Sequence, residues 1–299
     1  MRTIAFAFLM GLLATGRGSA HGFAPHGPAA VWTFDPWIVL PLLVAGGLYA
    51  RGTLILWRRT GVERKHWPWQ ALAFLGGWLT LAGALVSPLH WLGEHLFAFH
   101  MIEHEIVMAV SAPLMVIARP IGTWLWSLPR HLRVAIGRFI RLPAVSLVWD
   151  WLSRGLHATI LHGIAIWAWH APVLFDAAVS NVAIHRLQHL SFFLTALVFW
   201  WSVLRSSAPG AAAWHLLITM LHTSILGALM ALAPRVLYTA QTATAAEWGL
   251  TPLEDQQLAG LIMWVPAGTI YAGAALALIA IWIRRSGETG RRGDAVRAL

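Results

Sequence analysis

The sequence contains no cysteine among its 299 residues. Disulfide bonds, thiolate metal sites and cysteine-held iron–sulfur clusters are therefore excluded together. Without thiolates, a site for a soft metal ion must be built from histidine, methionine and carboxylate side chains.

Charged residues are also scarce. They make up 11% of the chain, against about 25% in an ordinary soluble domain, while 58% of the residues are hydrophobic and the mean hydropathy is +0.65. A chain of this composition needs lipid as its solvent, and its 19 tryptophans fit a membrane because tryptophan favours the headgroup layer. The formal charge of +9 predicts no nucleic-acid partner, because the basic residues flank apolar segments and form no basic stripe.

Seven apolar segments have lengths close to the ~20 residues that cross about 30 Å of hydrocarbon. The sequence therefore predicts an all-α fold, a polytopic bundle of seven transmembrane helices in membrane lipid. A further apolar stretch, Leu142–Trp151, is too short to span, and we expect an interfacial or half-inserted helix there. The predicted spans are residues 37–57, 69–89, 95–118, 156–175, 184–204, 212–233 and 257–283.

The first 20 residues resemble a secretory signal. Arg2 precedes an apolar run from Ile4 to Ala14, and the small residues Gly18 and Ala20 suit cleavage after residue 20. An uncleaved short helix is the alternative. We therefore predict a signal peptide over 1–20, a membrane domain over 21–283 and a basic cytoplasmic tail over 284–299.

The connections between the spans predict the orientation. With the N-terminus outside, the inner segments carry 16 lysines and arginines, and the outer segments carry only Arg186 and Arg235. Cytoplasmic loops hold the excess of positive charge in membrane proteins. The predicted topology is N-out and C-in.

This orientation gathers histidines in the outer halves of the spans, where ionisable groups are costly and usually mark a functional site. They are His100 and His104 on the third span, His170 at the end of the fourth, His185 and His189 at the start of the fifth, and His222 near the middle of the sixth.

The spacing of these histidines favours a metal site. Partners four residues apart share one helical face, so each pair can offer two imidazoles to one ion. Glu103 lies beside His100 and could bind the ion or orient a ligand. A single buried histidine is more often a packing residue, and the stripe of Met101, Met108 and Met115 is better explained by packing than by ligation.

Several motifs, in this order and spacing, resemble the integral-membrane CtaG family of cytochrome c oxidase assembly factors over about residues 35–283. They are residues 100–104 (HMIEH), 169–172 (WHAP), 185–192 (HRLQHLSF), 199–201 (FWW), 221–222 (LH) and 252–264 (PLEDQQLAGLIMW).

The resemblance implies a role in maturing haem–copper oxidases, with copper as the ion supplied and cytochrome c oxidase subunits as partners. It implies functional positions at His100, His104, His170, His185, His189, His222 and Asp255. Asp255 is equally well explained as a first-turn acid or helix cap. We expect the protein in a bacterial inner membrane with the histidines facing the periplasm.

Two other functions stay open on the sequence. A haem-binding oxidoreductase would use histidines as axial ligands, but His90 and His157 lie at opposite depths, so two helices could not hold two haems at matching levels. A copper or cation transporter is the other, although the inner halves of the spans offer only His162 as a main candidate. No nucleophile elbow, phosphate loop or HExxH motif is present, so no enzymatic role is predicted.

Overall fold

The computed structural model describes residues 31–60 and 67–297, and every regular element in this part of the chain is a helix. The predicted all-α, multi-pass fold is confirmed. The predicted signal peptide over 1–20 lies outside the described residues.

Six helices are long and apolar enough to cross a membrane, and a bent helix pair makes a seventh span if it is counted as one. Their order agrees with the seven predicted segments. The spans are α2 (Pro36–Thr60), α3 (Trp67–Val86), the run of α5 (Phe97–Glu105), η1 (Ile106–Ser111) and α6 (Ala112–Ala118), the bent pair α10 (Gly155–Trp169) and α11 (Pro172–Ser180), α12 (Val182–Leu204), α13 (Pro209–Ala231) and α14 (Pro252–Arg297).

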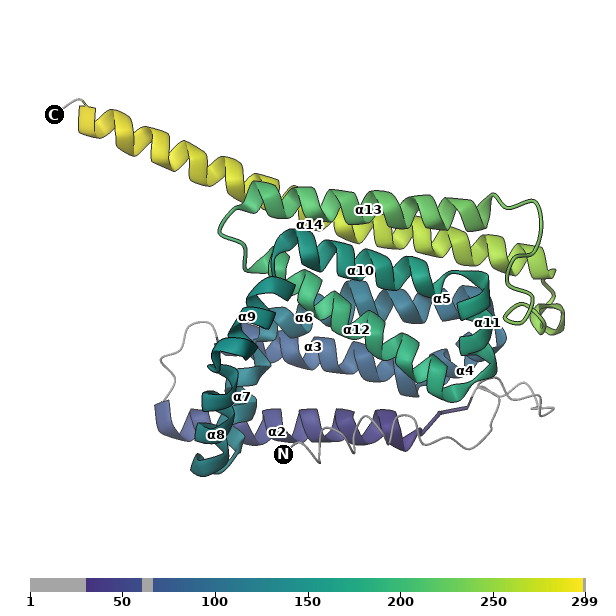
Figure 1. Cartoon of the computed structure of the whole chain (residues 1–299), viewed down its shortest axis with the longest axis horizontal. Helices are drawn as coiled ribbons and strands as arrows, with labels where there is room; N and C mark the ends of the chain where they lie inside the picture. Colours follow the sequence, from purple (N-terminus) through teal and green to yellow (C-terminus); the bar gives the residue numbers. More distant parts are fainter. Residues whose placement is uncertain (1–30, 61–66, 298–299) are drawn as a thin grey trace.

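Short helices cover the two ends of the bundle (Figure 1). α4 (Pro88–His95) and α11 lie at one end, which is the outer end in the predicted orientation. α7 (Pro120–Ser127), α8 (Arg130–Ile140) and α9 (Pro143–Leu152) lie at the other. α9 is the short helix that the stretch 142–151 predicts.

The boundary between the second and third spans differs from the prediction. α3 ends at Val86, and Ser87 caps a new helix by accepting a hydrogen bond from the Leu89 N–H at 3.1 Å. Pro88 suits the first position of that helix because its missing N–H would have no partner there. His95 therefore belongs to α4 and lies before the third span, with Leu96 in an extended conformation between them.

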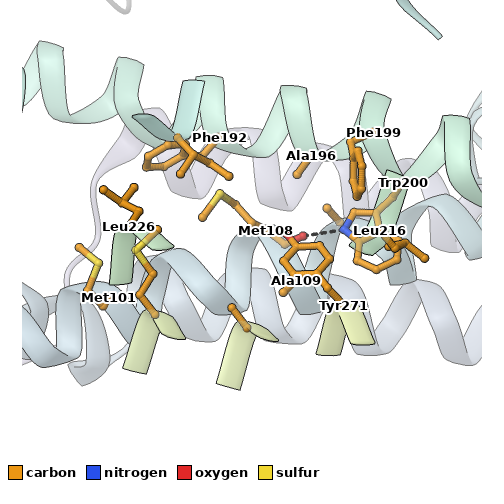
Figure 2. Packing of buried hydrophobic residues seen from close by; sticks show 14 of the residues in the cluster. Met101, Met108, Ala109, Phe192, Ala196, Phe199, Trp200, Leu216, Leu226 and Tyr271 are labelled. Carbon is orange, nitrogen blue, oxygen red and sulfur yellow. Dashed lines mark hydrogen bonds between the residues drawn. The ribbon is translucent and has the colours of Figure 1, made fainter. Parts of the chain in front are cut away.

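The third span contains a π-helical segment, η1, because Pro113 interrupts the α-helical hydrogen bonds. A proline has no N–H to continue the α-helical pattern, and the Ala112 N–H reaches back five residues to the carbonyl of Val107. The Met108 carbonyl instead accepts a 2.9 Å hydrogen bond from the Trp200 indole of α12, as Figure 2 shows. The indole thus satisfies a buried acceptor that the proline leaves open.

The fourth predicted span, 156–175, is broken near its outer end. α10 and α11 meet at 72°, because Pro172 disfavours helical geometry in the residue before it, and Ala171 is extended. The break leaves His170 as the C-cap residue of α10.

α13 and α14 pack side by side at the edge of the bundle (Figure 1). A Cβ atom on Gly260 would lie 2.5 Å from the Ala231 nitrogen and 2.6 Å from the Gly227 oxygen, so only glycine permits this crossing. α14 is longer than the predicted span 257–283, and its far end extends past the other helices.

Candidate functional site

Four of the predicted histidines form one buried cluster between α5 and α12. The ring centres of His100 and His104 are 4.3 Å apart, and those of His185 and His189 are 4.5 Å apart. The two pairs meet across the helices, with 5.5 Å between His100 and His185 and 4.9 Å between His104 and His189. All four side chains are at most 8% exposed. Each predicted i,i+4 pair thus shares a face, and the two faces point at each other.

His170 lies at the edge of this cluster, 6.3 Å from His104 between ring centres. Its Nδ1 bonds the Ile166 carbonyl at 2.7 Å, and its own carbonyl accepts a 2.7 Å hydrogen bond from the Tyr238 hydroxyl. Burial, followed by the charge of Asp176, raises the pKa of Tyr238 to about 12, so this hydroxyl is a donor at neutral pH. His170 is therefore held in place from two sides.

α4 adds a sixth histidine. His90 stacks near His185, with 5.8 Å between ring centres, and its Nδ1 lies 2.8 Å from a Glu103 oxygen. The same oxygen is 3.5 Å from His189 Nε2. Burial lowers the pKa of His90, but the nearby carboxylates, Glu103 foremost, outweigh burial and raise it to about 9. His90 is thus the positive partner of a buried carboxylate at neutral pH, and Glu103 joins it to the cluster.

The cluster holds polar atoms that no group in the described part of the protein satisfies. Both ring nitrogens of His104, Nε2 of His170 and Nδ1 of His189 are buried without a hydrogen-bond partner in the described part of the chain. Both amide atoms of Gln188, on the same helix as His189, are in the same condition. Buried polar atoms normally have partners, so the donor set fits a ligand bound between α5 and α12.

The side chains are not arranged as a finished metal site. Among residues 31–60 and 67–297, no group of three or more His, Asp or Glu side chains has the geometry to hold a metal ion. His185 and His189 instead share a hydrogen bond, with 2.8 Å between their Nε2 atoms. Metal–imidazole distances are near ~2 Å, so ring rotations would be needed for several nitrogens to reach one ion.

The methionine stripe belongs to the hydrophobic core. Met101 and Met108 are buried in the largest apolar cluster, with Phe192 and Ala109 among their neighbours (Figure 2), and Met115 lies in a smaller apolar cluster. The packing interpretation therefore accounts for all three.

His222 lies apart from the six clustered rings. Its Nδ1 accepts a 3.4 Å hydrogen bond from the Trp167 indole, and its Nε2 would be 3.4 Å from a Cβ on Gly163, so it packs against α10. His162, on the same helix, bonds Thr195 at 3.1 Å and has a buried Nε2 without a partner in the described residues. The middle of the bundle thus holds a second histidine group.

Asp255 is a helix cap, as its sequence position allowed, but the helix that it caps is α5. Its two oxygens accept hydrogen bonds from the N–H groups of Phe97 and Ala98 at 2.8 and 3.0 Å. These N–H groups open α5 and have no partner inside the helix, and a carboxylate there is favoured by the helix dipole. Asp255 therefore caps the helix that carries His100, from the first turn of α14.

Replacing Asp255 with alanine is expected to destabilise the protein by about 0.5–2 kcal/mol, the usual effect of losing a helix cap. Asp255→Asn, which keeps one acceptor, should lose less stability. Unfolding of both variants in detergent measures the two effects. Unchanged stability in Asp255→Ala would contradict the capping role.

The chain matches one family model over most of its length. The model of the cytochrome c oxidase caa3 assembly factor family (Caa3_CtaG) matches residues 47–285. The chain belongs to this family. No curated protein and no solved structure matches it. Membership makes the chain a membrane-embedded oxidase assembly factor and implies contact with the oxidase.

In this CtaG-family protein, the sequence did not assign three polar residues to the cluster: His90, which was considered only as a haem ligand, Glu94 and Gln188. Ser87-Pro88 is a helix-start signal and would have separated α4 from the third span. Gly93 permits α4 to lie against α5, since a Cβ there would be 3.0 Å from a Glu103 oxygen. No local sequence pattern predicts the contact between α4 and α5.

Proposed function

We propose that this oxidase assembly factor binds copper in the histidine cluster of α5 and α12 and supplies it to a cytochrome c oxidase subunit. The observation that carries the proposal is the convergence of His100, His104, His185 and His189 from two helices, with His170 beside them. Imidazole is a good copper ligand, and the chain offers no thiolate in its place.

The arrangement suits a protein that must release its ion. A site whose rings have to rotate before they bind holds the metal less tightly than a preorganised one. The His185–His189 hydrogen bond and the Glu103–His90 pair supply alternative partners for the rings once the ion leaves. The predicted N-out topology would open this end of the bundle to the periplasm, where the copper centre of an oxidase subunit could be loaded.

Replacing His100 and His104 together with alanine is expected to abolish copper binding, because it removes one complete imidazole pair. The protein is purified through a tag without histidine, loaded with Cu(I) or Cu(II), and its copper is counted by elemental analysis. The matched control is His131→Ala with His157→Ala, which removes two histidines at the opposite end of the bundle. Equal copper content in the two double variants would contradict the site.

One observation favours a transporter as the second candidate. Thr159 bonds His215 at 3.0 Å, and with His162 and Thr195 these residues place polar groups in the inner half of the bundle. Uptake of labelled copper into proteoliposomes by the purified protein would favour transport over delivery. A strong Soret absorbance would instead favour the haem-binding alternative.

A further inference from the structure

A large apolar groove runs along the bundle between α2 and α12. Its volume is about 1140 Å³, above the roughly 300–1,000 Å³ of pockets for drug-sized ligands. The walls are almost entirely apolar and include Leu42 of α2, Trp78 of α3, and Phe193 and Val198 of α12. Such a lining suits a long hydrocarbon chain.

Two arginines stand at the inner end of this groove. Arg205 caps α12, and its guanidinium lies 4.6 Å from the centre of the Trp201 ring. Arg119 lines the same end of the groove as Arg205, and burial together with the positive charge of Arg119 lowers the pKa of Arg205. Neither arginine forms an ion pair within the described residues. An anion between them would relieve the repulsion.

The backbone at Arg119 points to the same end of the groove. Arg119 has φ 51° and ψ 51°, and it is the only non-glycine residue with positive φ in the described part of the chain. Side chains other than glycine are strained in this left-handed conformation, and such strain is concentrated at functional sites. The turn separates α6 from α7 and brings Arg119 to the groove.

The outer end of the groove offers no comparable anion site. The two cations that line it there are already paired: Arg186 forms a 2.7 Å ion pair with Asp35, and His90 Nδ1 lies 2.8 Å from a Glu103 oxygen. Glu94 lines the same end, and its carboxylate would oppose an anion. An amphiphile with a negative head therefore fits in one direction only.

We propose that this groove binds one acidic phospholipid, with its phosphate between Arg119 and Arg205 and its acyl chains along the apolar wall. Guanidinium groups bind phosphate oxygens in a bidentate manner, and basic sites between spans on the cytoplasmic side recognise anionic lipids. In the predicted orientation, the lipid comes from the cytoplasmic leaflet.

Native mass spectrometry of the intact protein tests this inference, with phosphatidylglycerol or phosphatidylethanolamine titrated into the detergent. One phosphatidylglycerol adduct is expected, with phosphatidylethanolamine binding more weakly. Arg119→Gln with Arg205→Gln should weaken phosphatidylglycerol binding about 30-fold, and Arg205→Gln alone about fivefold, at the usual strength of such contacts. The matched control, Arg138→Gln with Arg141→Gln, removes two exposed arginines at the C-terminal end of α8, outside the groove, and should bind like wild type.

A second variant tests the groove itself. Gly122 lines it, and a Cβ atom there would meet nothing within 4 Å. Gly122→Phe should therefore block the lipid without loss of folding or of bound copper. Equal lipid affinity in the arginine double variant and its control, equal binding of the two lipids, or a retained adduct in Gly122→Phe would each overturn the proposal. So would a co-purifying protein chain that Gly122→Phe removes in place of the lipid.

Discussion

Gly260→Ala is expected to lower the free energy of unfolding by about 3 kcal/mol, at the upper end of overpacking costs. The added methyl would lie 2.5 Å from a backbone nitrogen of α13 and 2.6 Å from a backbone oxygen. Neither atom belongs to a side chain that could move aside, so the two helices must separate. The effect is diagnostic because glycine to alanine in a helix ordinarily stabilises by about 0.5–1 kcal/mol.

Gly273 supplies the matched control for this prediction. It lies on the same helix, and a Cβ atom there meets nothing within 4 Å. Gly273→Ala should leave stability unchanged or slightly higher. Unfolding of both variants in detergent, followed by circular dichroism, gives the comparison. Two variants of equal stability would show that the crossing of α13 and α14 is not close-packed at Gly260.

His90→Ala is expected to destabilise the protein by about 3–5 kcal/mol, the typical result of removing one partner of a buried ion pair. Glu103 is fully buried, and His90 holds one of its oxygens at 2.8 Å. Without His90, the carboxylate would lose its cationic partner at 2.8 Å, while His189 Nε2 lies 3.5 Å from the same oxygen. The variant should unfold at a clearly lower temperature in detergent.

A double-mutant cycle separates the pair from the packing of each side chain. His90→Leu with Glu103→Met replaces both charges by apolar groups, and such replacements are often neutral or stabilising. The double variant should recover most of the stability that His90→Leu loses. If the double variant loses as much stability as His90→Leu and Glu103→Met lose in sum, the two side chains are not directly coupled.

The helical periodicity made the four-histidine cluster predictable. Residues four apart share a helical face, so His100 with His104 and His185 with His189 had to lie as pairs. Burial also followed from the sequence, because an imidazole within an apolar span turns toward protein and away from lipid. The positions of both pairs near the same ends of their spans then favoured the meeting of α5 and α12 that the structure shows.

Contacts that depend on the folding of the connections could not be predicted in this way. His90 reaches Glu103 only because α4 turns back at Leu96. Asp255 caps α5 across more than 150 residues of sequence. His222 shares the depth of the spans but faces α10, and span positions alone carry no information on rotation about the helix axis. The break at Pro172 was predictable from the sequence, because a proline disfavours helical geometry in the residue before it.

The length of α14 has a mechanical consequence. One continuous helix begins at the residues that anchor the start of α5 and reaches beyond the far end of the bundle. A partner that pushed or pulled this rod along its axis would move Asp255, and with it the backbone three residues before His100. The spacing between the imidazole rings would then respond to an event at the opposite membrane surface.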